Sequence, residues 1–522
     1  MTKTHLKQMT LDEKIGQLIM FGFDALELND HAIRLIKEYK AGNVLLFARN
    51  IKTPKQLFQL NQNLQKLAME TLHIPLLISI DQEGGMVTRI KNGATYFPGA
   101  MTISATHHIQ NAYESGKRMG KELKALGINM NFAPVLDVNN NPYNPIIGTR
   151  SFGDQPDLVS QYGTEVIRGL QESVIATAKH FPGHGDTKVD SHVDLPTIEK
   201  SLSDLEAFEL IPFQAAIDGG VKAIMSAHIT FPRLTEEGLP TTLSYKCLTE
   251  VLRKQLGFKG LIVTDCLQMK AIQTYYTTKI GSLMAISAGA NLIMISHSEN
   301  LQVEAIEYIK EKVLSGELDI SIINDRVAKV LEYKFEMDEL DFSQTYENIQ
   351  AIVENKDTKR FALDVTRQAL TLIKGKLFCS DKKTLLIASS PLATTIADED
   401  DGSYSIICSV QQALPEIDTF EVSVTITDSE IKELITRSKQ YEQIVFCSYN
   451  ANIYQNQLTL IRELKDIVDL HVIAMRNPYD SFFEPNINNL VLLYEYTPNS
   501  VKVLIEYLRG TVTPLGIAPI EL

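Results

Sequence analysis

The sequence contains little cysteine and no long apolar run. Its 522 residues include five widely spaced cysteines and no CxxC pair. Their neighbours are apolar, as in SIICSV and IVFCSY, so we expect buried free thiols in a reducing compartment rather than a disulfide framework or a zinc site. No run of about 18 apolar residues occurs, which excludes a membrane-spanning helix. The first residues also lack the apolar core of a signal peptide, so we expect a cytoplasmic protein with no membrane partner.

Positive charge is not concentrated anywhere in the chain. The formal net charge is −14 at pH 7, and no basic stripe is present. Nucleic acid is therefore not expected as a partner, because its binding needs a basic face. Internal repeats and low-complexity tracts are also missing. The hydrophobic share of 44% is enough for large cores, and the length allows two to four domains.

Apolar runs of strand length alternate with helical patterns over the first part of the chain. Near-continuous apolar strands separated by helices are typical of parallel strands buried on both faces. Eight of them predict an α/β fold with an N-terminal (β/α)8, TIM-like barrel, and an open doubly wound sheet is the alternative. The predicted strands lie at 15–23, 42–47, 75–81, 128–138, 175–181, 222–229, 260–265 and 290–296.

A change of pattern near residue 337 indicates a second domain. A helical pattern covers 321–337, and the segment that follows is polar and weakly periodic. Strand-like runs then resume with TLLIAS, EVSVTI, IVFCSY, HVIAM and NLVLLYEY. We predict a barrel domain over 1–337, a linker over 338–375 and a smaller α/β sandwich domain over 376–522.

Polar side chains follow several of the predicted barrel strands. Catalytic groups of such barrels lie where strands end and βα loops begin. Each of these residues has a structural alternative, since Asp81 and Asp265 could cap helices and a single His228 is typical of a core. Their convergence on one face nevertheless predicts a site there. The residues in question are Asp81, Arg89, Arg150, Lys179, His180, His228 and Asp265.

A metal site is the less favoured interpretation of these residues. Metal-dependent hydrolases of barrel fold also collect ligands from the first strands, but here those strands end in FGFDAL and LLFARN, without histidine. We therefore expect no metal and no cofactor. Acid/base chemistry with a nucleophile remains, and Asp265 at the end of a rigid strand is the candidate nucleophile.

The partner of Asp265 is harder to place. Glu83 is one possibility, although EGG predicts a tight turn there. The segment DSH offers another, because residues 190 and 192 of an extended chain point to the same side. Asp190 could then orient the His192 imidazole, whose ordinary pKa near 6.5 suits both acid and base roles.

At this point the sequence resembles glycoside hydrolase family 3, in its bacterial β-N-acetylglucosaminidase branch. The resemblance covers most of the chain. The stretch KHFPGHGDTKVDSH is highly specific, because this branch uses a histidine–aspartate dyad in place of a carboxylic acid. Other matching segments are LISIDQEGGMVTRI, NMNFAPVLDV, IIGTRSFG, VKAIMSAHITFP and GLIVTDCLQMKAI. The motifs RNPYD and RGTVTPLGIAPIEL are similar to those of the two-domain members.

The resemblance implies roles for individual residues. Asp265 is expected to be the nucleophile, and His192 the general acid/base, assisted by Asp190. Within the same stretch we expect His184 to structure the loop and Asp186 to be solvated. N-acetylglucosamine in subsite −1 is expected to bind Asp81, Arg89, Arg150, Lys179 and His180, with His228 as a further contact.

The implied activity is that of a retaining exo-β-N-acetylglucosaminidase. We expect it to release terminal N-acetylglucosamine (GlcNAc) from GlcNAc–MurNAc, or its anhydro form, where MurNAc is N-acetylmuramic acid. Such a substrate places the enzyme in cell-wall recycling. The alternatives are a phosphorylase or β-glucosidase of the same family, or a non-catalytic sugar-binding relative. Met86 and Cys266 depart from the usual family pattern, which bears on the pocket wall rather than on the catalytic groups.

Overall fold

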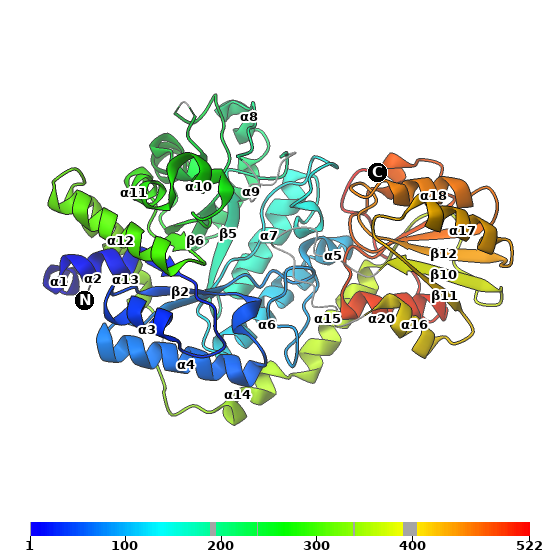
Figure 1. Ribbon diagram of the computed structural model, residues 1–522, viewed down its shortest axis with the longest axis horizontal. Helices are drawn as coiled ribbons and strands as arrows, with labels where there is room; N and C mark the ends of the chain where they lie inside the picture. The colour runs from blue at the N-terminus through cyan, green and yellow to red at the C-terminus, as the bar shows by residue number, and fades with distance from the viewer. Residues whose placement is uncertain (1, 188–194, 237, 338–339, 390–404) are drawn as a thin grey trace.

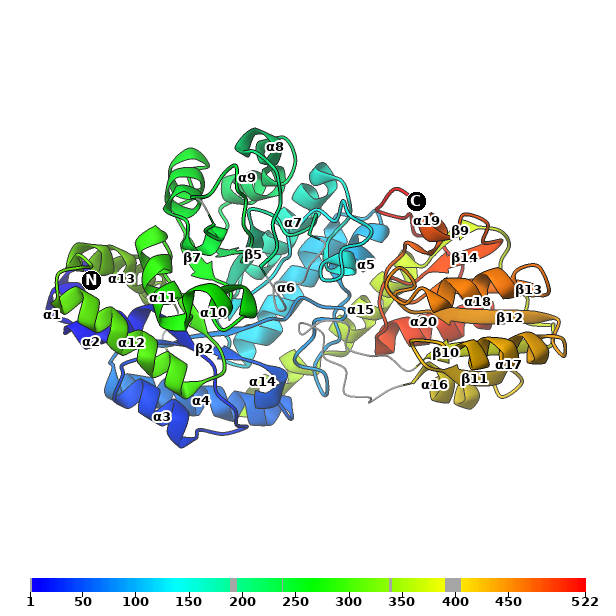
Figure 2. The same cartoon turned by 45° about the horizontal axis from the view of Figure 1, so that its top comes forward.

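The computed structural model describes residues 2–187, 195–236, 238–337, 340–389 and 405–522. The chain forms a larger N-terminal lobe and a smaller C-terminal lobe, which lie side by side (Figure 1). The same separation is visible after rotation in Figure 2, with α15 (Lys356–Ala369) between the lobes.

The N-terminal lobe is a closed barrel. Across residues 2–337, the gaps at 188–194 and 237 aside, eight parallel strands pair in the order β7-β6-β5-β4-β3-β2-β1-β8. The ends of this order meet, because Val263 and Leu292 form a parallel bridge and the Thr264 N–H donates to the Leu292 carbonyl at 3.0 Å. This confirms the predicted (β/α)8 barrel. The strands are β1 (Ile19–Phe21), β2 (Asn43–Leu46), β3 (Leu77–Ile80), β4 (Met130–Asn131), β5 (Ile175–Phe181), β6 (Ala223–Ser226), β7 (Leu261–Thr264) and β8 (Ile293–Ile295).

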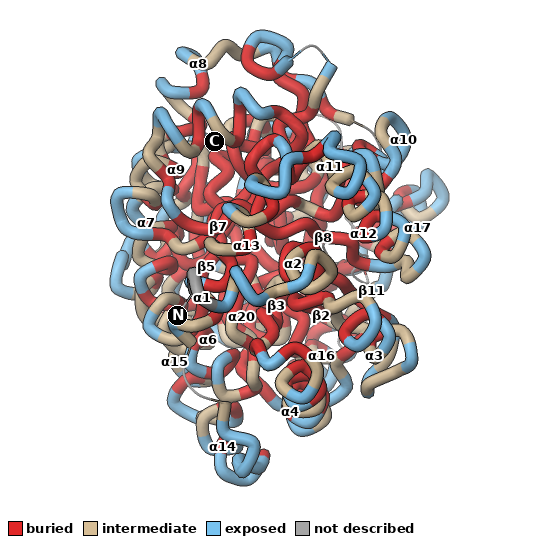
Figure 3. The backbone as a smooth tube through the Cα atoms, turned by 90° about the vertical axis from the view of Figure 1, so that its left-hand side faces the viewer, coloured by how far each residue is buried: buried red, intermediate tan, exposed pale blue. Residues whose placement is uncertain are grey.

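Amphipathic helices surround these strands. In α4 (Pro54–Thr71), Leu57, Leu60, Leu64 and Leu67 recur at helical spacing and are buried. Figure 3 shows the strands as buried and the outer sides of the helices as exposed. The other long helical segments are α2 (Leu11–Leu18), α3 (Asp30–Lys37), α6 (Gln110–Ala125), α7 (Pro156–Leu170), α9 (Leu210–Asp218), the π-helical η4 (Lys246–Gln255), α11 (Thr278–Ala288), α12 (Glu299–Leu314) and α13 (Ile320–Phe335). Shorter turns are α1 (Thr2–Gln8), η1 (Ala48–Asn50), α5 (Ala100–Ala105), η2 (Gly148–Arg150), α8 (Leu202–Glu206), η3 (Thr241–Leu243) and α10 (Lys270–Tyr276).

Seven of the eight strands are shorter than the predicted runs, and two of them differ most. The run at 15–23 begins as helix α2, whose Thr10 cap and Glu13 form a capping box, and only its later part is β1. The run at 128–138 contains β4, which covers two residues, and then continues as irregular chain. Within that chain, Val135 still forms a bridge with Lys179 of β5.

The C-terminal lobe is an α/β sandwich, as predicted. In its described residues, six strands pair in the order β11-β10-β12-β13-β14-β9, and only β9 is antiparallel to its neighbour. Separate apolar clusters cover the two faces of this sheet, which is why its central strands β10, β12 and β14 are mostly apolar. The strands are β9 (Thr371–Lys374), β10 (Thr384–Ser389), β11 (Asp418–Val422), β12 (Gln443–Ser448), β13 (Asp469–Ala474) and β14 (Asn489–Leu492). The helices are α16 (Ile406–Ala413), α17 (Asp428–Ser438), α18 (Asn456–Leu464), α19 (Asp480–Phe483) and α20 (Pro498–Leu508).

The segment predicted as a linker, 338–375, has regular structure in its described part. It contains α14 (Tyr346–Val353), α15 and strand β9. Because β9 pairs with β14, the end of this segment belongs to the second sheet. Non-local pairing of this kind leaves no signal in the local pattern.

The cysteines are free but differ in burial. Cys247, Cys266 and Cys447 are buried, as expected from their apolar neighbours, whereas Cys379 and Cys408 are exposed. The expectation that all five are buried is therefore wrong for two of them. An apolar neighbour on a helix such as α16 can face inward while the cysteine beside it faces outward.

No helix in the described parts of the chain is both long enough and apolar enough to cross a bilayer.

Candidate active site

The carboxyl ends of the barrel strands surround a cavity of about 260 Å³. Among the predicted site residues, those lining it are Asp81, Arg89, Arg150, Lys179, His180 and Asp265. Asp190 and His192 lie outside the described residues. Further lining side chains include Phe47, Arg49, Glu83, His184, Met225, Cys266, Met269, Met294, Ser296 and His297.

Asp265 directly follows β7 and is partly exposed. Its Oδ1 accepts a hydrogen bond from the Cys266 N–H at 2.7 Å, which orients the carboxylate. The next residue, Leu267, donates its N–H to the Met294 carbonyl of β8 at 2.9 Å. The candidate nucleophile is therefore held by backbone contacts at the mouth of the barrel.

His228 lies behind this segment and is not among the residues that line the cavity. Its Nε2 is 3.0 Å from the Cys266 carbonyl, and its Nδ1 is 2.9 Å from Thr242 Oγ1. A carbonyl oxygen only accepts, so Nε2 carries the proton and donates. These contacts engage both ring nitrogens with protein atoms, which fits support of the Asp265 segment rather than the expected contact with sugar.

A buried charge network connects β3, β5 and the loop after β4. Lys179 Nζ is 2.7 Å from Asp81 Oδ1 and 2.7 Å from Glu83 Oε1. Arg150 donates to Glu83 through Nε at 2.9 Å and Nη2 at 2.8 Å, a bidentate geometry. Lys179 is 2% exposed, so its ammonium depends on these carboxylates for solvation.

Glu83 remains ionised within this network. Burial acts to raise the pKa of Glu83, but the positive charges of Arg150 and Lys179 outweigh it and hold the pKa far below its usual range. A carboxylate in this state cannot supply a proton near neutral pH. Of the two candidates that the sequence offered as partner to Asp265, Glu83 is therefore unsuited to be the general acid.

Asp137 organises the histidines that follow β5. It is buried, and its Oδ1 accepts hydrogen bonds from the backbone N–H groups of His180 at 3.1 Å and His184 at 2.7 Å. Its Oδ2 lies 2.7 Å from His180 Nδ1. Burial acts to raise the pKa of Asp137, but His180 outweighs it and the pKa is lowered. The carboxylate therefore fixes the orientation of the His180 ring.

His184 and Asp186 are both engaged with the protein. The Nδ1 of His184 contacts Thr187 Oγ1 at 2.8 Å, and burial, with the charge of His180, lowers the pKa of His184 to about 4. His184 is thus neutral at pH 7 and orders the turn. Asp186, expected to be solvated, keeps 35% of its side chain exposed and forms an ion pair with Lys200 at 2.8 Å.

Several residues of the site were not predicted from the sequence. Arg49 follows β2, donates to the Ser296 carbonyl at 2.8 Å and lies 4.2 Å over the Phe47 ring. Asp137 follows β4 in the segment NMNFAPVLDV. The signal that identified Asp81 and Asp265, a polar residue after an apolar run, is present for both of them. Among the described residues, no group of three or more His, Cys, Asp or Glu side chains is arranged to hold a metal ion.

Comparison with known proteins identifies the family of the chain. The glycosyl hydrolase family 3 N terminal domain matches residues 10–333. Beta-hexosaminidase A of Pseudoalteromonas piscicida is 32% identical over 364 residues, which cover 65% of this chain and 60% of that protein. The beta-hexosaminidase of Nitrosomonas eutropha is 36% identical over 261 residues, covering 49% of this chain and 73% of that protein.

A solved structure is similar over nearly the whole chain, both domains included. A glycoside hydrolase family 3 beta-N-acetylglucosaminidase from Paenibacillus sp. str. FPU-7 is 38% identical, with a TM-score of 0.91 over 98% of this chain and 99% of that one. The closed barrel, the sandwich domain and the carboxylate at the end of β7 thus occur together with a family match over most of the barrel. The chain belongs to glycosyl hydrolase family 3 and is a glycoside hydrolase.

Proposed function

We propose that the protein is a retaining exo-β-N-acetylglucosaminidase that releases a terminal, non-reducing GlcNAc. The observation that carries the proposal is the Asp265 carboxylate at the mouth of a cavity lined by Asp81, Arg89, Lys179 and other polar groups. Its volume of about 260 Å³ is below the roughly 300–1,000 Å³ that drug-sized ligands occupy, which favours one sugar unit and so an exo mode of cleavage. The names of the similar proteins support the N-acetylhexosamine specificity.

In the proposed reaction, a carboxylate oxygen of Asp265 attacks the anomeric carbon of GlcNAc. The bond from that carbon to the glycosidic oxygen breaks, and His192 protonates the departing oxygen. Water then attacks the anomeric carbon of the glycosyl-enzyme ester while His192 takes its proton. The bond from that carbon to Asp265 breaks and frees the carboxylate, so the configuration is retained after two inversions. The roles of His192 and Asp190 rest on the sequence resemblance.

The charge network suits the recognition of sugar hydroxyls. Lys179 contacts Oδ1 of Asp81, whose side chain remains 18% exposed at the cavity. Because the cations Lys179 and Arg150 are paired with carboxylates, donors and acceptors lie together without a large net charge. We propose that Asp81, Arg89, Arg150, Lys179 and His180 bind the GlcNAc in subsite −1.

The proposed natural substrate is GlcNAc–MurNAc, or its anhydro form, derived from muropeptides during cell-wall recycling in the cytoplasm. A product assay on this disaccharide, with and without attached peptide, tests that proposal directly. Release of free GlcNAc from both would support it, and cleavage of neither would contradict it.

The enzyme activity itself is tested with nitrophenyl β-glycosides of GlcNAc and of glucose, each with and without phosphate. We expect free GlcNAc as the product, at a rate independent of phosphate. Formation of GlcNAc-1-phosphate would instead identify a phosphorylase, and preference for the glucoside would identify a β-glucosidase. Any turnover that disappears in Asp265→Ala would exclude a non-catalytic sugar-binding protein.

A further inference from the structure

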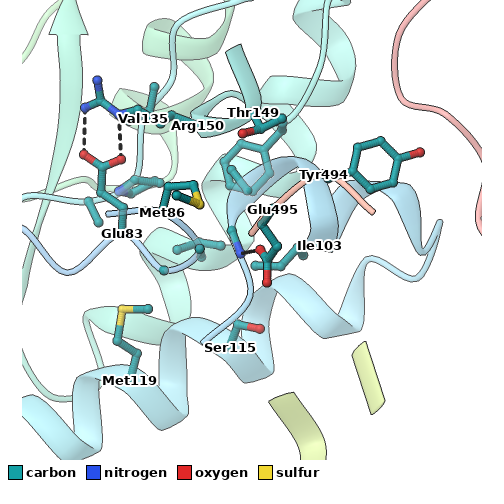
Figure 4. Close-up of a pocket in the computed structure, with 18 of the residues that line it drawn as sticks. Glu83, Met86, Ile103, Ser115, Met119, Val135, Thr149, Arg150, Tyr494 and Glu495 are labelled. Carbon is teal, nitrogen blue, oxygen red and sulfur yellow. Dashed lines mark hydrogen bonds and ion pairs between the residues drawn. The ribbon is translucent and has the colours of Figure 1, made fainter. Parts of the chain in front are cut away.

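The second domain reaches the barrel through residues 494–497, which follow β14. Glu495 in this segment is 2% exposed. Its Oε2 accepts hydrogen bonds from the Gly99 N–H at 2.8 Å and from Thr102 Oγ1 at 2.8 Å, and both donors belong to the barrel. Figure 4 shows the Glu495 side chain pointing from the second domain toward the part of the barrel that carries Ile103.

The Glu495 carboxylate also lies against the turn that directly follows Glu83. Gly84 and Gly85 both have positive φ, and the Gly85 N–H donates to the Phe97 carbonyl at 2.8 Å. A Cβ on Gly85 would lie 3.1 Å from Glu495 Oε2, which shows how closely the carboxylate approaches the turn. The next residue, Met86, has its sulfur 3.3 Å from the Tyr496 nitrogen and packs with the apolar cluster of the second domain.

The other half of the Glu83–Arg150 pair is in contact with the second domain as well. Arg150 belongs to η2, which begins at Gly148. A Cβ on Gly148 would lie 2.4 Å from the Asn477 side-chain oxygen of the RNPYD motif, so η2 lies directly against that motif. The second domain therefore supports both of the loops that carry this buried ion pair.

In the described structure, Glu495 accepts its hydrogen bonds from uncharged donors. Besides the Gly99 N–H and Thr102 Oγ1 of the barrel, the donor is Thr497 Oγ1 at 2.9 Å. Burial raises the pKa of Glu495. A buried carboxylate in such surroundings costs free energy, and a neutral side chain could fill the same space at lower cost. The stability of the second domain alone therefore does not explain why a carboxylate occupies this position. The two barrel donors that converge on one of its oxygens do explain it.

We propose that Glu495 is a positioning residue for the sugar site: it fixes the Glu83-Gly84-Gly85 turn and thereby the orientation of Arg150 and Lys179. The proposal rests on the proposed function insofar as these two cations bind GlcNAc. It assigns the second domain a part in substrate recognition, although none of its residues lines the cavity as described.

The test compares Glu495→Ala and Glu495→Gln with a matched control, Gln457→Ala. Gln457 is 1% exposed and also makes three hydrogen bonds, but all of them lie within the second domain: Tyr449 N at 2.8 Å, Tyr449 O at 2.9 Å and Val424 O at 3.1 Å. The measurements are KM and kcat on the nitrophenyl glycoside that the wild type cleaves best, the inhibition constant of the free sugar, and the thermal midpoint.

In Glu495→Ala we expect KM and the sugar inhibition constant to rise together by about fivefold or more, because groups that hold the sugar in both ground and transition states are displaced. Glu495→Gln keeps an acceptor oxygen for the barrel donors and should recover most of this loss. Gln457→Ala should lower the thermal midpoint without changing either constant. If Glu495→Ala behaves like Gln457→Ala, with a lower midpoint and unchanged constants, the proposal is overturned.

Two further outcomes remain decisive. If Glu495→Ala does not fold, Thr102→Val removes a donor from the barrel side, and unchanged constants in that variant would refute the proposal. If the wild type cleaves a β-glucoside but no GlcNAc glycoside, the proposed function fails. The comparison of Glu495 variants on the glucoside then still tests the positioning role.

Discussion

Replacing Glu83 by glutamine tests the buried charge network most directly. The amide keeps the shape of the side chain but removes its charge, and its NH2 group would face a donor of Arg150 or Lys179. Breaking a buried ion pair from one side costs about 3–5 kcal/mol, because the partner charge stays buried. In this variant Lys179 retains its ion pair with Asp81, whose Oδ1 is 2.7 Å from the ammonium nitrogen. The cost should therefore lie at the lower end of this range. We expect a loss of about 3 kcal/mol, which lowers the folding equilibrium constant roughly 10²-fold.

Urea unfolding at pH 7, followed by a signal from the barrel, measures this loss. The matched control is Glu347→Gln, which breaks the Lys55–Glu347 pair of the same 2.7 Å length on the surface. Water solvates both partners there, so the urea midpoint should stay close to that of the wild type. Equal effects of the two substitutions, or a neutral Glu83→Gln, would refute the idea that Glu83 holds otherwise unsolvated cations.

The pH dependence gives a second check on the same residue. The pKa of Glu83 is lower in the folded protein than in the unfolded chain, so its contribution to stability is present above the unfolded pKa, about 4.5. This contribution is lost progressively as the pH falls from there toward the folded pKa. The difference in stability between wild type and Glu83→Gln should therefore be constant near pH 7 and shrink below about pH 4.5. A difference that grows in acid would contradict the sign of this shift.

Three other predictions concern the chemistry. Asp265→Asn should abolish turnover but retain GlcNAc binding, measured by calorimetry, because the amide keeps the shape but cannot attack carbon; near wild-type kcat would refute the assignment. His192→Ala loses general acid/base help worth about 10²–10⁴-fold, so it should give a burst of nitrophenol. Azide needs no base and should therefore restore turnover in this variant. The loss of activity in Asp190→Ala should be smaller. Rescue of His184→Ala, with none in His192→Ala, would mean that the wrong histidine was chosen. Treatment with EDTA should leave kcat unchanged, and a loss restored by zinc would revive the metal alternative.

Local sequence patterns identified most of the barrel and part of its site. An apolar run of strand length followed by a polar residue is a signal contained within about ten residues, and it located Asp81, Lys179 and Asp265 at strand ends. The same signal was present for Asp137 and Arg49 but was passed over. The local pattern was less reliable at 15–23, because a short apolar run is compatible with both a helix and a strand. There the capping box at Thr10 stabilises a helix over the first part of the run.

Pairing between distant residues was decided only by the tertiary structure. Glu83 and Arg150 are 67 residues apart, Asp137 and His180 are 43 apart, and Glu495 and Gly99 are 396 apart. The barrel brings the first two pairs to one end because its parallel strands share a direction, whereas Glu495 comes from the second domain, and in each case the choice of partner depends on how the loops are packed. For this reason the sequence by itself determined the fold and the candidate nucleophile. Only the folded chain decided that Glu83 is an ion-paired support, that His228 lies behind Asp265, and that the second domain contacts the loops of the site.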